Sequence, residues 1–122
     1  MKVKVSESSG PVLDWLVAKC EDYLKHIRLD KFKQWEDLER TQVRDDDYTY
    51  WNPSEDWAQG GPIIEREGID LIKQDGYWDA DDNGQAQVSC MVSGPTALIA
   101  AMRCYTVSKL GEEVEVPERL LP

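Results

Sequence analysis

Residues 69–111 read IDLIKQDGYWDADDNGQAQVSCMVSGPTALIAAMRCYTVSKLG, and their pattern decides the fold. Three short runs have strand character: residues 69–73, 77–79 and 85–92. The turn formers Asp75-Gly76 separate the first two runs, and Asn83-Gly84 is a strong signal for a two-residue hairpin leading into the third. The stretch therefore predicts a three-stranded antiparallel meander.

A helix is expected on each side of this meander. Two apolar stripes recur at three- and four-residue spacing: Leu13, Leu16, Val17, Cys20 and Leu24 in the first, and Leu98, Ala101, Met102 and Tyr105 in the last. Residues 26–43 carry a weaker helical pattern, which fits either a second helix or a partly exposed excursion. The fold class that follows is α+β, a small antiparallel sheet with N- and C-terminal helices packed on one face.

The chain ends are expected to add little to this core. Val3-Lys4-Val5 alternates like a short first strand, and residues 114–116 resemble a short edge strand within a loosely ordered tail, residues 112–122. A length of 122 residues fits one domain, 1–122, that needs neither disulfides nor a structural metal.

The charge is strongly acidic but uneven. The 24 acidic and 14 basic residues give a net charge of −10, which repels a phosphate backbone and argues against direct binding of duplex nucleic acid. Residues 25–44 hold six basic and four acidic residues, so this segment is +2 and the remainder −12. No apolar run is long enough to span a membrane, and the first residues lack the features of a signal peptide. A cytoplasmic protein without a membrane partner is expected.

The dipeptide Gly-Pro precedes three of the expected helices, at Gly10-Pro11, Gly61-Pro62 and Gly94-Pro95. Proline suits a first helical turn, and this alone accounts for the pattern. A sharper interpretation is that glycine lets an anion approach the unpaired N–H groups of a helix start. Gln59-Gly60-Gly61-Pro62 is the best candidate for such a site, because Trp57 lies next to it and offers a surface for stacking.

Metal, cofactor and catalytic chemistry have little support. Residues 79–84 match the first half of a calcium loop, but the glutamate needed at the twelfth position is Cys90, so a solvated turn is favoured. The three cysteines have no metal-site spacing and are expected to be buried thiols, and His26 is expected at the surface. The sequence thus predicts no cofactor, no metal and no catalytic residues, and favours a protein that is not an enzyme.

Three blocks carry a resemblance to a known family: residues 3–20, the run NPSEDWAQGGPIIERE at residues 52–67, and residues 94–111. Together they closely resemble the NinX-like proteins of tailed bacteriophages and prophages, a family of unknown function. The resemblance covers most of the chain and is lost in residues 25–50. It implies a phage accessory protein that acts inside an infected bacterium, and it carries over no catalytic residues.

The first functional hypothesis is a non-catalytic binding module that sequesters a small anionic, nucleotide-like signal of host defence. Its expected ligand-binding residues are Trp57, Gln59, Gly60, Gly61, Glu65, Arg66, Trp78, Gly94, Thr96 and Arg103. The alternative is an acidic inhibitor or adaptor that binds a host protein and imitates nucleic acid. A minor alternative is hydrolysis of a nucleotide signal. A homo-oligomer with a shared pocket stays open.

Overall fold

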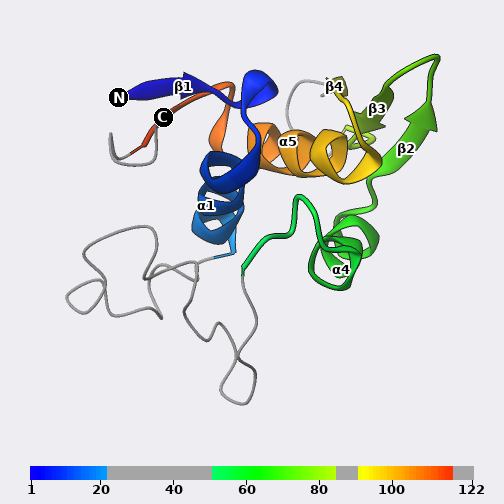
Figure 1. Ribbon diagram of the computed structural model, residues 1–122, viewed down its shortest axis with the longest axis horizontal. Helices are drawn as coiled ribbons and strands as arrows, with labels where there is room; N and C mark the ends of the chain where they lie inside the picture. The colour runs from blue at the N-terminus through cyan, green and yellow to red at the C-terminus, as the bar shows by residue number, and fades with distance from the viewer. Residues whose placement is uncertain (22–50, 85–90, 117–122) are drawn as a thin grey trace.

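A computed structural model describes residues 1–21, 51–84 and 91–116 of the chain (Figure 1). The elements, in chain order, are β1 (Lys2–Lys4), the short 3-10 helix η1 (Val5–Glu7), α1 (Gly10–Cys20), α4 (Trp57–Glu67), β2 (Asp70–Lys73), β3 (Trp78–Asp81), β4 (Met91–Gly94), α5 (Ala97–Leu110) and β5 (Glu113–Glu115). Several predictions concern residues outside the described ranges: the helix considered for residues 26–43, the basic segment 25–44, residues 85–90 of the third expected strand, residues 117–122 of the tail, Leu24, His26 and Cys90.

The predicted meander is confirmed. Strands β2, β3 and β4 form an antiparallel sheet in that order, with Leu71 opposite Ala80 and Ala80 opposite Val92. The turn at Asp75-Gly76 is closed by the N–H of Gln74, which donates to the carbonyl oxygen of Tyr77 over 2.9 Å.

The predicted two-residue hairpin at Asn83-Gly84 is wrong. Asp81 pairs with Met91, so residues 82–90 connect β3 to β4. Asn83 and Gly84 do adopt the left-handed conformation, with φ of 58° and 79°. Their N–H groups bond to the carboxylates of Asp81 and Asp82 at 2.9 and 3.1 Å, which makes a local turn after the end of β3.

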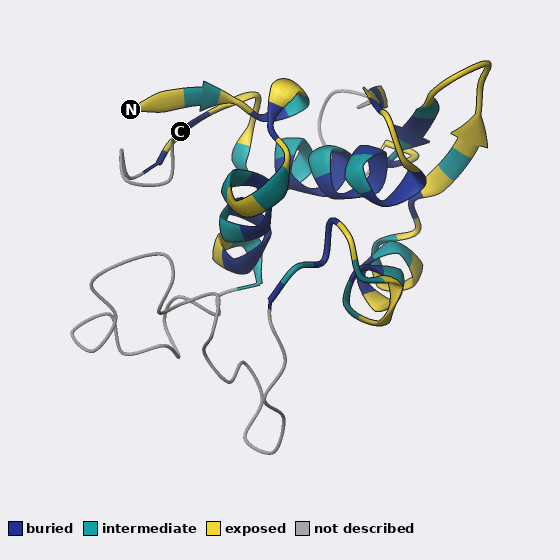
Figure 2. Cartoon of the chain, viewed as in Figure 1, coloured by how far each residue is buried: buried dark blue, intermediate teal, exposed yellow. Residues whose placement is uncertain are grey.

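Helix α5 is the centre of the α+β fold that the sequence predicts. It contacts all three strands of the meander on one side, and α1 and α4 also pack against it. Buried residues gather between these elements, including Leu13 and Val17 of α1, Ile63 of α4, Ala80, Val92, Ala101 and Met102. Figure 2 shows the buried side of each helix turned toward its neighbours and the exposed side turned outward.

The two ends of the chain form a second sheet. β1 pairs antiparallel with β5, with Val3 opposite Val114, and the amino group of Met1 donates to the carbonyl oxygen of Val116 over 2.9 Å. Val114 and Val116 are buried against Val5 and Leu16. Residues 113–115 thus form the short strand expected near this position, and the partner of that strand is the start of the chain.

Two of the three expected helix starts are wrong. α4 begins at Trp57, because the side chain of Asp56 caps it by accepting the N–H of Ala58 over 2.9 Å, and Pro62 lies inside the helix. Pro62 is exposed, so the backbone carbonyl that loses its helical partner there can bond to water. α5 begins at Ala97 with Thr96 as its cap, and only Pro11 lies in a first turn as predicted.

None of the helices described in residues 1–21, 51–84 and 91–116 has the length and apolar character that crossing a membrane requires.

Candidate functional site

The first turns of α4 and α5 lie side by side. A Cβ atom on Gly60 would come within 2.6 Å of Leu98 Cδ2, so the two helices touch near their starts. They meet again at their far ends, where Lys109 Nζ lies 3.1 Å from Glu67 Oε1. Both N-termini are therefore at the same end of this helix pair, and the exposed indole of Trp57 and the exposed Thr96 belong to that end.

The glycine pair has no open anion-binding loop around it. The N–H of Gly60 donates to the carbonyl oxygen of Asp56 over 2.9 Å, as in any helical turn. Gly60 is buried, and a Cβ at this position would also lie 2.6 Å from the carbonyl oxygen of Pro53. Gly60 is thus a point of close packing, and the argument for an anion at Gly60-Gly61 fails together with the helix start at Pro62.

Gln59 holds the loop that precedes α4. Its Oε1 accepts the N–H of Asn52 over 2.7 Å. The same loop is tied to α1 by Asp14: its Oδ1 accepts the N–H of Ser54 over 2.9 Å, and its carbonyl oxygen accepts Trp51 Nε1–H over 2.8 Å. The role of Asp14 was not predicted. A carboxylate next to the buried stripe of α1 is the sequence signal that points to it, since a buried acid needs hydrogen-bond donors.

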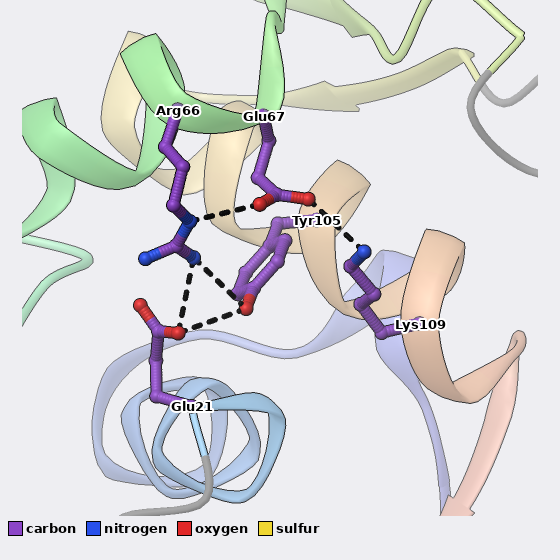
Figure 3. Close-up of polar contacts among 5 residues, drawn as sticks. All are labelled: Glu21, Arg66, Glu67, Tyr105 and Lys109. Carbon is purple, nitrogen blue, oxygen red and sulfur yellow. Dashed lines mark hydrogen bonds and ion pairs between the residues drawn. The ribbon is translucent and has the colours of Figure 1, made fainter.

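Arg66 belongs to a charged cluster at the opposite end of α4 (Figure 3). Its guanidinium donates to Glu67 Oε2 over 2.9 Å, to Glu21 Oε2 over 3.0 Å and to the Tyr105 hydroxyl over 3.2 Å. The Tyr105 hydroxyl in turn donates to Glu21 Oε2 over 3.1 Å, and Lys109 pairs with Glu67. Side chains of α4 and α5 and the residue that ends α1 are joined in this way, so Arg66 is already engaged by protein carboxylates.

The electrostatics of this cluster hold it together at neutral pH. The hydrogen bonds that Arg66 donates to the carboxylates of Glu67 and Glu21 raise the pKa of Arg66 further above its ordinary value. Burial raises the pKa of Tyr105, and the nearby carboxylate of Glu21 adds to this, so the hydroxyl stays a donor. Burial alone would raise the pKa of Glu67, but the hydrogen bonds from Arg66 and Lys109 outweigh it and hold this pKa below its ordinary value.

Glu67→Gln is expected to make the free energy of unfolding depend less on pH in the acidic range. Because the pKa of Glu67 is lower in the folded state, ionised Glu67 stabilises the fold above its unfolded pKa, and this contribution is lost as the pH falls below about 4.5. The variant should be less stable at pH 7 but should lose less stability between pH 5 and about 3. Urea unfolding at several pH values measures this. Glu65→Gln, at an exposed position of the same helix, is the control and should keep the wild-type profile.

Arg103 and Gly94 connect β4 to the rest of the fold. Arg103 Nε–H donates to the carbonyl oxygen of Ser8 over 2.7 Å, and Nη1–H donates to that of Ser93 over 2.9 Å. A Cβ atom on Gly94 would lie 2.6 Å from the backbone nitrogen of Ala100. Trp78 packs partly buried against the main core, and Glu65 is exposed on α4.

The expected ligand-binding residues therefore separate into groups. Trp57, Gln59, Gly60 and Gly61 lie in the first turns of α4, where Gly60 packs against Leu98 of α5, the helix that Thr96 caps. Arg66 lies at the far end of α4. Trp78 and Gly94 pair with each other in the meander, and Arg103 donates a hydrogen bond to Ser93 of β4. α4 carries Trp57 at its first position and Arg66 next to its last, so these two side chains lie at opposite ends of the helix.

The acids and thiols of the described residues fit structural roles. Among residues 1–21, 51–84 and 91–116, no three His, Cys, Asp or Glu side chains gather in a group able to hold a metal ion. Asp79 accepts hydrogen bonds from Gln74 and Ser93. Cys104 is buried as expected, and burial raises the pKa of the partly buried Cys20 thiol to about 12, which keeps it protonated and unreactive at neutral pH.

Comparison with known proteins identifies the family. The family model described as "Bacteriophage P22, NinX" matches residues 4–109, which include every described helix except the last residue of α5 and all strands of the meander. No curated protein matches the chain. Since the family match extends over far more than half of the sequence, the chain belongs to the NinX family of bacteriophage proteins.

Proposed function

We propose that this NinX protein is a phage accessory protein of the host cytoplasm that sequesters a small nucleotide-like anion without chemically changing it. The observation that carries the proposal is the exposure of Trp57, the first residue of α4, which is 55% accessible although α4 packs against the first turn of α5 through Gly60 and Leu98. An exposed indole is costly to leave in water and offers a flat surface on which a base can stack.

The starts of α4 and α5 differ in what they offer an anion. At α4 the carboxylate of Asp56 already accepts a first-turn N–H and brings its own negative charge. At α5 the cap is the neutral hydroxyl of Thr96, which accepts the N–H of Ile99 over 3.1 Å. The N–H groups of Ala97 and Leu98 have no acceptor within the helix, and the helix dipole adds about half a positive charge there. The α5 start therefore favours a phosphate.

This arrangement changes the earlier hypothesis about which residues hold the ligand. Arg66 and Arg103 donate to Glu21, Glu67, Ser8 and Ser93, so the positive end of α5 replaces a cationic side chain as the anion-binding element. A binding module without a nucleophile or base aimed at the phosphate is the simplest function for such a site.

Trp57→Ala is expected to weaken nucleotide binding by about 5- to 150-fold, because stacking on an aromatic side chain contributes roughly 1–3 kcal/mol per base. The fold should persist, since the indole is more than half exposed. Thermal shifts and calorimetric titrations of the whole chain with linear and cyclic mono- and dinucleotides measure the effect. Tyr77→Ala is the matched control, because Tyr77 is also an exposed aromatic residue but belongs to the β2–β3 turn.

The same panel separates the proposal from its competitors. A nucleotide that raises the melting temperature of the wild-type chain and of Tyr77→Ala, but not that of Trp57→Ala, supports sequestration at this site. If no nucleotide shifts the melting temperature, the proposal fails. Release of a hydrolysed product in the incubations would replace sequestration by the hydrolase hypothesis.

A further inference from the structure

The hydrogen-bond pattern of the meander shows which backbone groups of β2 point away from β3. In an antiparallel pair, residues alternate between those that bond to the partner strand and those whose N–H and C=O point away from it. Gln74 bonds to Tyr77 across the turn, so Ile72 and Asp70 are the next residues of β2 that bond to β3. The backbone groups of Leu71 and Lys73 therefore point away from β3. We call this pair of residues the β2 edge.

The opposite edge of the meander is formed by β4, and Arg103 donates a hydrogen bond to it. The same alternation turns the backbone groups of Met91 and Ser93 away from β3, and Arg103 Nη1–H donates to the carbonyl oxygen of Ser93 over 2.9 Å. Among the strands of residues 1–21, 51–84 and 91–116, none pairs with the β2 edge. Figure 1 shows β2 on the side of the molecule opposite the β1–β5 sheet.

The sheet face next to the β2 edge is both apolar and acidic. The strand register places Asp70, Ile72, Asp79, Asp81, Met91 and Ser93 on the face turned away from α5, here called the outer face. Ile72 is 39% and Met91 57% exposed. Asp79 is buried and accepts hydrogen bonds from Gln74 and Ser93. The negative charge that this face presents to solvent therefore comes from Asp70 and Asp81.

We propose that the β2 edge and the outer face bind an extended, lysine- or arginine-rich segment of a partner protein, which adds to the meander as a fourth strand. Backbone hydrogen bonds to Leu71 and Lys73 would hold the segment, and its alternate side chains would meet Ile72 and the carboxylates of Asp70 and Asp81. The negative charge of the protein indicates which kind of partner fits this edge. A basic segment is attracted to a chain of net charge −10, whereas a second copy brings the same acids and the same net charge against it. This interaction is separate from the proposed nucleotide site.

The test uses an octapeptide of alternating lysine and valine as the probe and the full chain labelled with nitrogen-15. The peptide is expected to shift the amide signals of Leu71 and Lys73, slow their hydrogen exchange, and bind more weakly as salt is raised. Lys73→Pro should weaken binding at least about tenfold, because proline removes an edge N–H while the β2–β3 ladder does not use that group. Lys73→Gln should bind at least as well as the wild type, since it keeps the N–H and removes a repelling charge.

Two controls keep the result interpretable. A peptide of the same sequence with alternate backbone N-methyl groups cannot extend the sheet and should lose binding to the unaltered protein. Asp70→Asn should weaken binding, whereas Glu55→Gln, which removes the same charge at an exposed position of the loop before α4, should not. The proposal is overturned if the Leu71 and Lys73 amides do not respond, if the N-methylated peptide binds equally well, or if the free chain is a dimer that Lys73→Pro dissociates.

Discussion

Gly60→Ala is expected to lower the free energy of unfolding by about 2 kcal/mol, whereas Gly61→Ala is expected to raise it by up to about 1 kcal/mol. Both glycines lie inside α4, where alanine is preferred over glycine by about 1 kcal/mol. A new Cβ at Gly61 would find only the Trp57 ring, at an ordinary 3.9 Å. At Gly60 it would lie 2.6 Å from the carbonyl oxygen of Pro53 and from Leu98 Cδ2.

The clash at Gly60 cannot be relieved cheaply. The end of the Leu98 side chain can rotate, but the Pro53 carbonyl is part of a loop whose neighbours Asn52 and Ser54 are bonded to Gln59 and Asp14. Moving that loop breaks buried hydrogen bonds, so the cost is expected near the upper end of the ~1–3 kcal/mol usual for overpacking.

Thermal and urea unfolding of the two variants measure the contrast directly. A difference of about 3 kcal/mol corresponds to roughly 10 °C or more in melting temperature for a domain of this size. Equal effects of the two substitutions would contradict the packing role of Gly60. Loss of nucleotide binding in a Gly61→Ala variant that remains folded would instead point back to a ligand at the glycine pair.

Gly94→Ala is expected to destabilise the protein by about 3 kcal/mol. The added Cβ would lie 2.6 Å from the backbone nitrogen of Ala100 and 2.9 Å from its Cα. Both atoms belong to the backbone of α5, and α5 contacts all three strands of the meander. The helix must therefore shift as a whole and lose packing along its length, which puts the cost at the high end for an overpacked core, about 3 kcal/mol.

Met91→Ala is the matched control for this variant, because it lies in the same strand but is exposed on the outer face. Its effect should stay within about 0.5 kcal/mol. Urea unfolding should show a lower midpoint for Gly94→Ala with an unchanged slope. A Gly94→Ala variant as stable as Met91→Ala would show that β4 and α5 are not in the close contact described.

The two substitutions with the largest expected losses of stability are thus at Gly60 and Gly94, two glycines that the sequence suggested as ligand-binding residues. Glycine permits close approach of any atom, whether from a ligand or from another segment of the chain, and sequence pattern does not distinguish these cases. In the structure the atoms that approach Gly60 belong to Leu98 and Pro53, and those that approach Gly94 belong to Ala100. Sequence pattern does not reveal the role of Arg66 either, because its partner Glu21 lies 45 residues earlier in the chain.

Local pattern was sufficient for the helices α1 and α5 and for the order of the meander strands, because amphipathic spacing and turn residues act over a few neighbouring positions. It misplaced the starts of α4 and α5, which follow the caps Asp56 and Thr96. It also predicted a two-residue hairpin at Asn83-Gly84, although Asp81 of β3 pairs with Met91 of β4. The pairing of β1 with β5, the tie between Asp14 and Ser54, and the separation of Arg66 from Trp57 were decided only in the folded structure. The first two of these features depend on contacts between segments far apart in the chain, which the local pattern of either segment does not reveal.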